Sequence, residues 1–309
     1  MKRSLLIVSL VFVISLSALA APLGTNARAV IPSQVQQIIS VDYRAMRNSE
    51  TAMALKARVL PENLKEFETT LRTMGIADND VEQLTFASFR SRQSVRAVGI
   101  AQGQFPTKKI VLRMKQRKIR PQKYRQALIY PTGTGMVMSF LDENTLLFGE
   151  SVAVHEAIDS RDGEAEGLNS NSQLTDLIAA VESGPVWSIL DQRGTQNMLR
   201  SILGDASRLA DYDTVKKRLI GSRYTMDFSR GVNFDLDVIT SDSMTAATLS
   251  SLLKAGVLYK KMNASAVEKM ALDSMSVDSD SARLQIHFKS DDKKFQSLLS
   301  SDLFAAVSR

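Results

Sequence analysis

Cysteine is absent from this sequence of 309 residues, and histidine occurs only twice. The absence of cysteine excludes disulfide bonds, thiol catalysis, thiolate metal sites and iron–sulfur clusters. Because histidine is the commonest general acid or base, a chain with two histidines has few means of hydrolytic catalysis. The sequence contains no His-Glu-x-x-His or Gly-x-Ser-x-Gly motif. We therefore expect no catalytic residues, no metal site and no cofactor.

The remaining candidates for chemistry have a simpler structural explanation. His287 lies on the polar side of the alternating segment 283–289, and His155 lies in a short helical segment, so both are predicted to be surface residues. Two carboxylate clusters, at 78–82 and 273–280, lack the central glycine of a calcium-binding loop. The second cluster instead suits a hairpin turn.

Long apolar runs are also scarce. The single long one occupies residues 5–19, directly after two basic residues, and small residues follow at 18–20. This order is typical of a secretory signal peptide, here residues 1–21, and the run is shorter than the roughly 20 residues of a membrane span. A second small-x-small site at 27–29 leaves the cleavage position open, and a retained N-terminal anchor is the alternative. We expect an exported protein, periplasmic or extracellular.

The rest of the chain alternates between strand and helix periodicity. In the first half, a strand is predicted at 37–43, followed by a helical stretch from Ser49 to Met74 that Pro61 should break. The elements expected after it are a hairpin over 81–102, a helix at 106–118, two strands flanking 133–135, a strand at 145–148 and a helix at 151–159.

The second half repeats this order of elements. Its clearest feature is a hairpin over 224–238 in which apolar and polar residues alternate around a turn at 229–231. The other expected elements are a strand at 186–191, a helix-rich stretch at 195–219, a helix at 243–261, a hairpin over 272–288 and a terminal helix that begins at Asp291.

Between the halves, residues 161–171 are rich in glycine, serine, asparagine and acidic residues, which is typical of a linker. We therefore predict an α+β protein of two tandem, similar halves, at 30–160 and 172–309. Each half would be an antiparallel sheet of hairpins backed by helices. The alternative is a pair of unrelated α+β halves, because few residues are identical between them.

Short motifs in the first half carry a family resemblance. They are Val41-Asp42-Tyr43, Gly75-Ile76, Asp80 to Leu84, Gly99, Gly103, Phe105, Leu141-Asp142, Leu147-Phe148-Gly149 and Val154 to Asp159. With these motifs the chain resembles uncharacterised secreted bacterial proteins with a duplicated, ferredoxin-like α+β domain. The resemblance covers most of residues 30–160 and implies a fold, but no activity.

The distribution of charge is the one compositional anomaly. The chain has a net charge of +6, yet residues 83–141 contain twelve lysines and arginines and no acidic residue. Four of the basic residues recur at helical spacing on a stretch that Pro121 should end, with Ile110, Val111 and Met114 expected to face inward. These four candidates for binding an anionic partner are Lys109, Arg113, Arg117 and Arg120.

Such a field attracts anions, which outside the cytoplasm include lipid headgroups, envelope polysaccharide and acidic protein surfaces. Nucleic acid is an improbable partner, because base-stacking aromatic residues are few in this block. A solvated basic surface without a partner is the simpler alternative. We expect an exported, non-catalytic binding or interaction protein. The alternative function is a carboxylate-dependent envelope enzyme with its site between the two halves.

Overall fold

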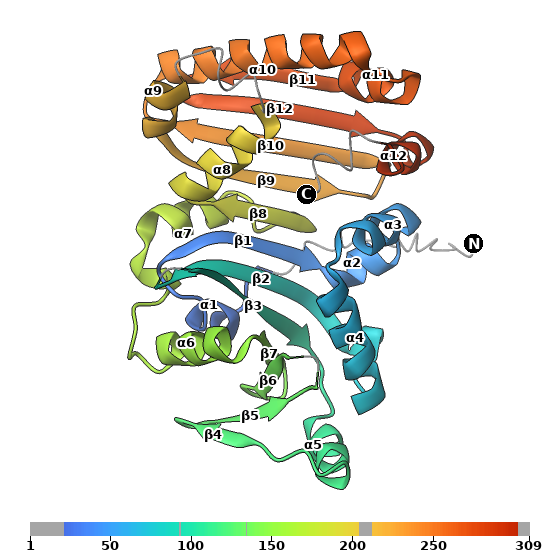
Figure 1. Ribbon diagram of the computed structural model, residues 1–309, viewed down its shortest axis with the longest axis vertical. Helices are drawn as coiled ribbons and strands as arrows, with labels where there is room; N and C mark the ends of the chain where they lie inside the picture. Colours follow the sequence, from blue (N-terminus) through green and yellow to red (C-terminus); the bar gives the residue numbers. More distant parts are fainter. Residues whose placement is uncertain (1–21, 93, 134, 204–211, 302–309) are drawn as a thin grey trace, which may run out of the picture.

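The computed structural model describes residues 22–92, 94–133, 135–203 and 212–301. The predicted signal peptide therefore lies outside the described residues. Twelve strands form one sheet in the order β11-β12-β10-β9-β8-β1-β2-β3-β7-β6-β5-β4, and every neighbouring pair is antiparallel (Figure 1). The strands are β1 (Val35–Asp42), β2 (Val81–Ser91), β3 (Ser94–Gly103), β4 (Gln122–Tyr124), β5 (Ala127–Pro131), β6 (Val137–Phe140), β7 (Thr145–Gly149), β8 (Val186–Leu190), β9 (Leu219–Asp227), β10 (Val232–Thr240), β11 (Met275–Asp280) and β12 (Arg283–Ser290).

Helices cover the sheet and confirm the α+β class. They are α1 (Thr25–Ala29), α2 (Tyr43–Arg47), α3 (Glu50–Val59), α4 (Glu62–Met74), α5 (Thr107–Gln116), α6 (Ser151–Arg161), α7 (Ser172–Ala179), α8 (Gln192–Leu203), α9 (Tyr212–Lys217), α10 (Ser243–Asn263), α11 (Ala266–Asp273) and α12 (Asp292–Leu299). No helix in the described ranges is long and apolar enough to cross a membrane.

The predicted hairpins and helix starts are confirmed. The pairs β2–β3, β9–β10 and β11–β12 are the three expected hairpins. Ser49 and Asp291 accept hydrogen bonds from backbone N–H groups of the first turns of α3 and α12, as N-cap residues do. Pro61 separates α3 from α4, as expected. These features depend on residues close together in the chain, which is why the sequence pattern located them.

The strands are arranged alike on both sides of the central pair β1–β8. Outward from this pair the first five strands are β1-β2-β3-β7-β6 on one side and β8-β9-β10-β12-β11 on the other, and β5 and β4 extend the first side alone. A duplication would give this order, and the duplication itself stays a prediction. The ferredoxin-like expectation finds no support, because a split βαβ unit places a third strand between the two strands that a helix joins, whereas β1 and β2 are direct neighbours here.

Each half has a hydrophobic cluster of its own, and a further hydrophobic core spans the two halves. It joins Ile38 of β1 to Trp187 and Ile189 of β8, and it includes buried residues of α1, α6 and α7. The segment expected as a linker contributes Leu168, which is fully buried and whose N–H donates to the carbonyl of Ile31 at 2.7 Å. The acidic and glycine residues of this segment are mostly in its exposed part, 162–166. The composition therefore did not indicate that Leu168 would be buried.

Candidate functional site: an apolar pocket between the sheet and α2–α4

Two rows of side chains that cross four strands form the floor of the pocket. Because directly paired residues of antiparallel strands point to the same face, the register of β1, β2, β3 and β7 assembles each row. The rows are Ile39–Phe86–Gly99–Phe148 and Val41–Leu84–Ala101–Leu146. Strand β2 carries apolar side chains on both faces, since its alternate residues Ala87 and Phe89 are buried in the core on the opposite side. Both faces of this part of the sheet are covered by helices.

A short turn after β1 begins the roof of the pocket. The Asp42 side chain accepts a hydrogen bond from the N–H of Ala45 at 3.1 Å and starts α2, so that the strand expected to reach Tyr43 ends one residue earlier. Tyr43 is 2% exposed and lines the pocket. An aspartate followed by a helical stretch is an N-cap pattern, and it was the local signal for this turn.

Helix α4 supplies most of the remaining roof. Phe67 and Leu71 face inward at helical spacing, and the Phe67 ring stacks on Phe148 with 4.6 Å between centroids. The helix ends at Gly75, whose φ of +94° belongs to the left-handed region that favours glycine. The N–H of Ile76 donates to the carbonyl of Leu71 at 3.0 Å and completes the helix end.

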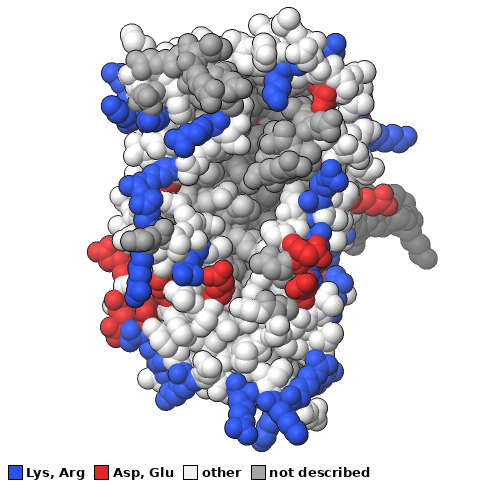
Figure 2. Space-filling view, viewed as in Figure 1, with Lys and Arg blue, Asp and Glu red and all other residues white. Residues whose placement is uncertain are grey.

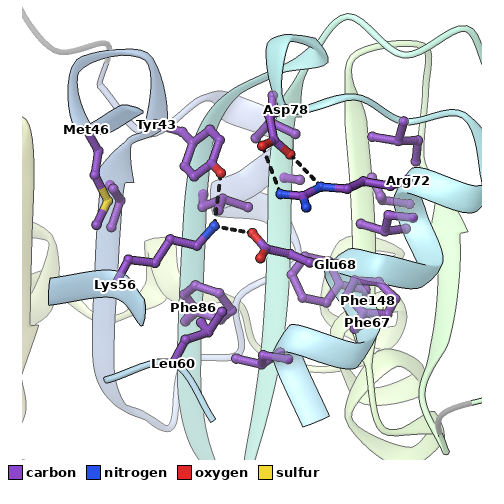
Figure 3. A pocket seen from close by; sticks show the side chains of 18 of the residues that line it. Tyr43, Met46, Lys56, Leu60, Phe67, Glu68, Arg72, Asp78, Phe86 and Phe148 are labelled. Atoms are coloured by element: carbon purple, nitrogen blue, oxygen red, sulfur yellow. Dashed lines mark hydrogen bonds and ion pairs between the residues drawn. The ribbon is translucent and has the colours of Figure 1, made fainter. Parts of the chain in front are cut away.

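The space between floor and roof is about 380 Å³. This volume lies within the range of small-molecule sites, which are concave and mostly apolar. Figure 3 shows aromatic and aliphatic side chains around the cavity, with charged side chains gathered on one side. Its apolar lining residues are Ile39, Val41, Met46, Val59, Leu60, Pro61, Leu64, Phe67, Leu71, Ile76, Ala77, Val81, Leu84, Phe86, Ala101, Leu146 and Phe148.

Every charged residue of the lining faces a partner of opposite charge. The Lys56 ammonium donates to Glu68 and to the Tyr43 hydroxyl, the latter at 3.0 Å. The Arg72 guanidinium holds both oxygens of Asp78, at 3.1 and 2.9 Å. Figure 3 shows the two ion pairs next to each other.

Burial and hydrogen bonding act in opposite directions on Lys56. Burial alone would lower the pKa of its ammonium, but the hydrogen bonds to Glu68 and Tyr43 outweigh this effect and raise the pKa above its ordinary value. Lys56 is therefore a protonated donor throughout the physiological range, and not a general base.

The four predicted anion-binding residues divide into two pairs. Arg113 of α5 donates to the carbonyl of Met74, at 3.2 Å, and Arg117 donates to the carbonyl of Thr73 at 3.1 Å. These carbonyls lie in the last turn of α4, where a helix dipole is negative and backbone acceptors are free. Arg113 and Arg117 therefore hold the end of the pocket helix.

Lys109 and Arg120 remain exposed, and neither forms an ion pair with another described residue. Arg120 lies beyond α5, which ends at Gln116 instead of reaching Pro121. Ile110 and Met114 are buried as expected, whereas Val111 points outward and is exposed. The prediction of one continuous basic helix face is therefore wrong.

Positive charge nevertheless gathers at one end of the molecule. Figure 2 shows lysine and arginine side chains together at the end where Figure 1 places α5. The exposed apolar residue Leu112 lies on the same helix.

The other candidates for chemistry lie elsewhere. His287 is half exposed, and its Nδ1 is 2.5 Å from an oxygen of Asp235 on the neighbouring strand. The His155 ring stacks on Tyr124, with 4.0 Å between centroids. Within the described ranges, no group of three or more histidine, aspartate or glutamate side chains could hold a metal ion.

No local sequence pattern predicted the pocket. Its floor residues are spread over four strands, and only their register brings them into two rows. One signal was present, because β2 carries apolar residues at both odd and even positions, which indicates a strand covered on both faces.

Comparison with known proteins supports the fold and does not indicate a function. No family model and no curated protein matches the chain. Crystal forms I, IV and III of the treponemal protein TP0453 match at TM-scores of 0.47, 0.48 and 0.50, with 10–11% sequence identity. The matches cover 91–92% of this chain and 97–98% of the TP0453 chains. At this identity the likeness concerns the fold alone.

Proposed function

We propose that this protein is an exported, non-catalytic binding protein that holds an apolar small molecule, or the apolar part of one, in the pocket beneath α3 and α4. The cavity of about 380 Å³ with its apolar lining is the observation that carries the proposal. Water gains few hydrogen bonds in such a space, whereas an apolar ligand is removed from water there. Phe67 and Phe148 supply flat surfaces against which a hydrocarbon can pack.

The ion pairs of the pocket support binding in preference to catalysis. Glu68 and Asp78 are its carboxylates, and each is already held by a cation. A general acid or base must exchange a proton with a substrate, which such pairing opposes. The cavity also lies within the first half of the chain, whereas the alternative enzyme would have its site between the halves.

A fluorescent apolar probe tests this function. N-phenyl-1-naphthylamine is uncharged and becomes bright when it leaves water, and we expect saturable binding to the protein. Val41→Trp places a large ring on the floor of the cavity and should abolish the signal. The matched control is Val95→Trp, because Val95 is 59% exposed and lies on the neighbouring hairpin. Binding that persists in Val41→Trp, or that is absent from the parent protein, would overturn the proposal.

The cationic end supports a second candidate function, contact with an anionic envelope component or an acidic protein surface. The observation that favours it is the gathering of lysine and arginine around α5 (Figure 2). Lys109 and Arg120 remain its candidate residues, because Arg113 and Arg117 already bind α4.

Retention on anionic vesicles tests the second candidate. Lys109→Gln/Arg120→Gln should lower retention on phosphatidylglycerol vesicles without changing the melting temperature, and added salt should weaken the parent in the same way. Lys216→Gln/Lys217→Gln, in α9, is a control with the same change of charge. Equal retention of all three proteins would contradict the contact.

A further inference from the structure

A chemical preference follows from the polar corner of the pocket, where Tyr43, Lys56 and Glu68 meet (Figure 3). We propose that this corner binds an uncharged hydrogen-bond acceptor, such as the carbonyl of an ester, while the hydrocarbon tail of the same molecule lies on the floor. This inference rests on the proposed function and names the class of ligand.

The lining of the pocket is electrically neutral. Lys56 with Glu68 and Arg72 with Asp78 are its charged residues, and they form two complete pairs. A carboxylate or ammonium on the ligand would enter an apolar space without a free counter-charge, and the loss of its hydration would oppose binding. The pocket therefore favours a ligand whose buried end carries no charge.

Two hydrogen-bond donors in the corner have no acceptor among the described residues. A lysine ammonium has three N–H groups, and Lys56 uses two of them, toward Tyr43 and Glu68. The Tyr43 oxygen accepts from Lys56, and its own O–H has no described acceptor. Because Tyr43 is 2% exposed, solvent cannot readily supply one. A ligand oxygen placed between the two groups would satisfy both donors.

An acceptor suits the corner better than a donor does. The second oxygen of Glu68 could accept a bond, but the Glu68 side chain is 29% exposed and can be hydrated. The groups that lack partners away from water are donors, so the unmet requirement is for an acceptor. A carbonyl oxygen, with two lone pairs, can serve Tyr43 and Lys56 together.

The register of the sheet sets the direction of the tail. Tyr43 directly follows β1, whose Ile39 and Val41 begin the two rows of the floor. The rows then cross β2 and β3 and end at Phe148 and Leu146 on β7. A molecule with its carbonyl at Tyr43 would lay its tail across the strands toward Phe148.

Competition against N-phenyl-1-naphthylamine tests the preference with three ligands of equal chain length: methyl decanoate, decanoate and decane. We expect methyl decanoate to displace the probe at a concentration about tenfold lower than the other two, the effect of about one hydrogen bond to a charged donor. Tyr43→Phe should reduce this advantage, because the Lys56 ammonium remains as a donor, and should leave displacement by decane unchanged.

Lys56→Met/Glu68→Met removes the charged donor and should lower the advantage further than Tyr43→Phe does, and it leaves no buried charge unpaired. Tyr259→Phe and Lys260→Met, on the exposed part of α10, are the matched controls. Equal displacement by all three ligands would overturn the preference while the proposed function stands. Stronger displacement by decanoate would overturn the argument from neutrality. A parent protein that binds no probe would instead refute the proposed function.

Discussion

Gly99 on β3 lies directly opposite Phe148 on β7, and the missing side chain at position 99 leaves room for the Phe148 ring. A Cβ at this position would be 2.2 Å from the ring, closer than any real contact. The ring in turn stacks on Phe67 of α4. A glycine within a strand thus determines where the floor and roof of the pocket meet.

We expect Gly99→Ala to move the Phe148 ring, to narrow the pocket and to lower stability by about 1–3 kcal/mol, as overpacking does. Probe binding should weaken, as measured by fluorescence titration, and chemical denaturation gives the stability. Gly256→Ala is the control, because a Cβ at Gly256 in α10 meets nothing within 4 Å. This control should gain up to about 1 kcal/mol of helix stability. Unchanged binding in Gly99→Ala would show that the ring does not define the pocket.

The arginines at the end of α4 provide a second prediction. Arg113→Gln/Arg117→Gln removes hydrogen bonds to the carbonyls of Met74 and Thr73, and it should lower stability by about 1 kcal/mol. Lys109→Gln/Arg120→Gln removes the same charge without removing a described contact, so its thermal unfolding should match that of the parent. If both double variants unfold at the same temperature, the arginines do not support α4.

Acid should weaken the start of α10. The backbone N–H of Thr245, with hydrogen bonds from the Thr245, Ser241 and Arg218 side chains, lowers the pKa of Asp242 to about 2. A carboxyl whose pKa is lower in the folded than in the unfolded state stabilises the fold above its unfolded pKa of about 4. This contribution is lost as the pH falls from about 4 to about 2.

Asp242→Asn should therefore flatten the dependence of the melting temperature on pH between 4 and 2. The amide oxygen of asparagine can still accept at the N-cap, but it carries no charge to lose. Glu143→Gln, at an exposed turn, is the control and should leave the pH profile as it is in the parent. If the melting temperatures of Asp242→Asn and the parent fall in parallel with pH, Asp242 is not the source of this loss of stability.

A cut in the exposed segment 162–166 should leave the two fragments associated. The pairing of β1 with β8 and the core around Ile38 and Trp187 join the halves after the chain is broken. Limited digestion with a glutamate-specific protease, followed by size-exclusion chromatography, should give one peak that contains both fragments. Two separate folded fragments would show that each half has an independent core.

The sequence predicted local features well and long-range features poorly. Ser49, Pro61 and Asp291 act on their own neighbours, so the helix boundaries that they set could be predicted. The pocket depends on Ile39, Phe86 and Phe148 being in register, which no local pattern records. Arg113 and Arg117 were recognised as a basic surface, but their bonds to α4 depend on the packing of two helices far apart in the chain.

The pairing of β1 with β8 also has a consequence for the time order of folding. Val41 and Val186 are partners, so one edge of β1 stays open until roughly 150 more residues have been added. At typical rates of synthesis this interval lasts roughly 7–30 s. Throughout it, β1 exposes unpaired backbone groups that a strand of another chain could bind. The centre of the finished sheet is therefore the edge of the nascent one, and a factor that delays premature pairing there would raise the yield of the native protein.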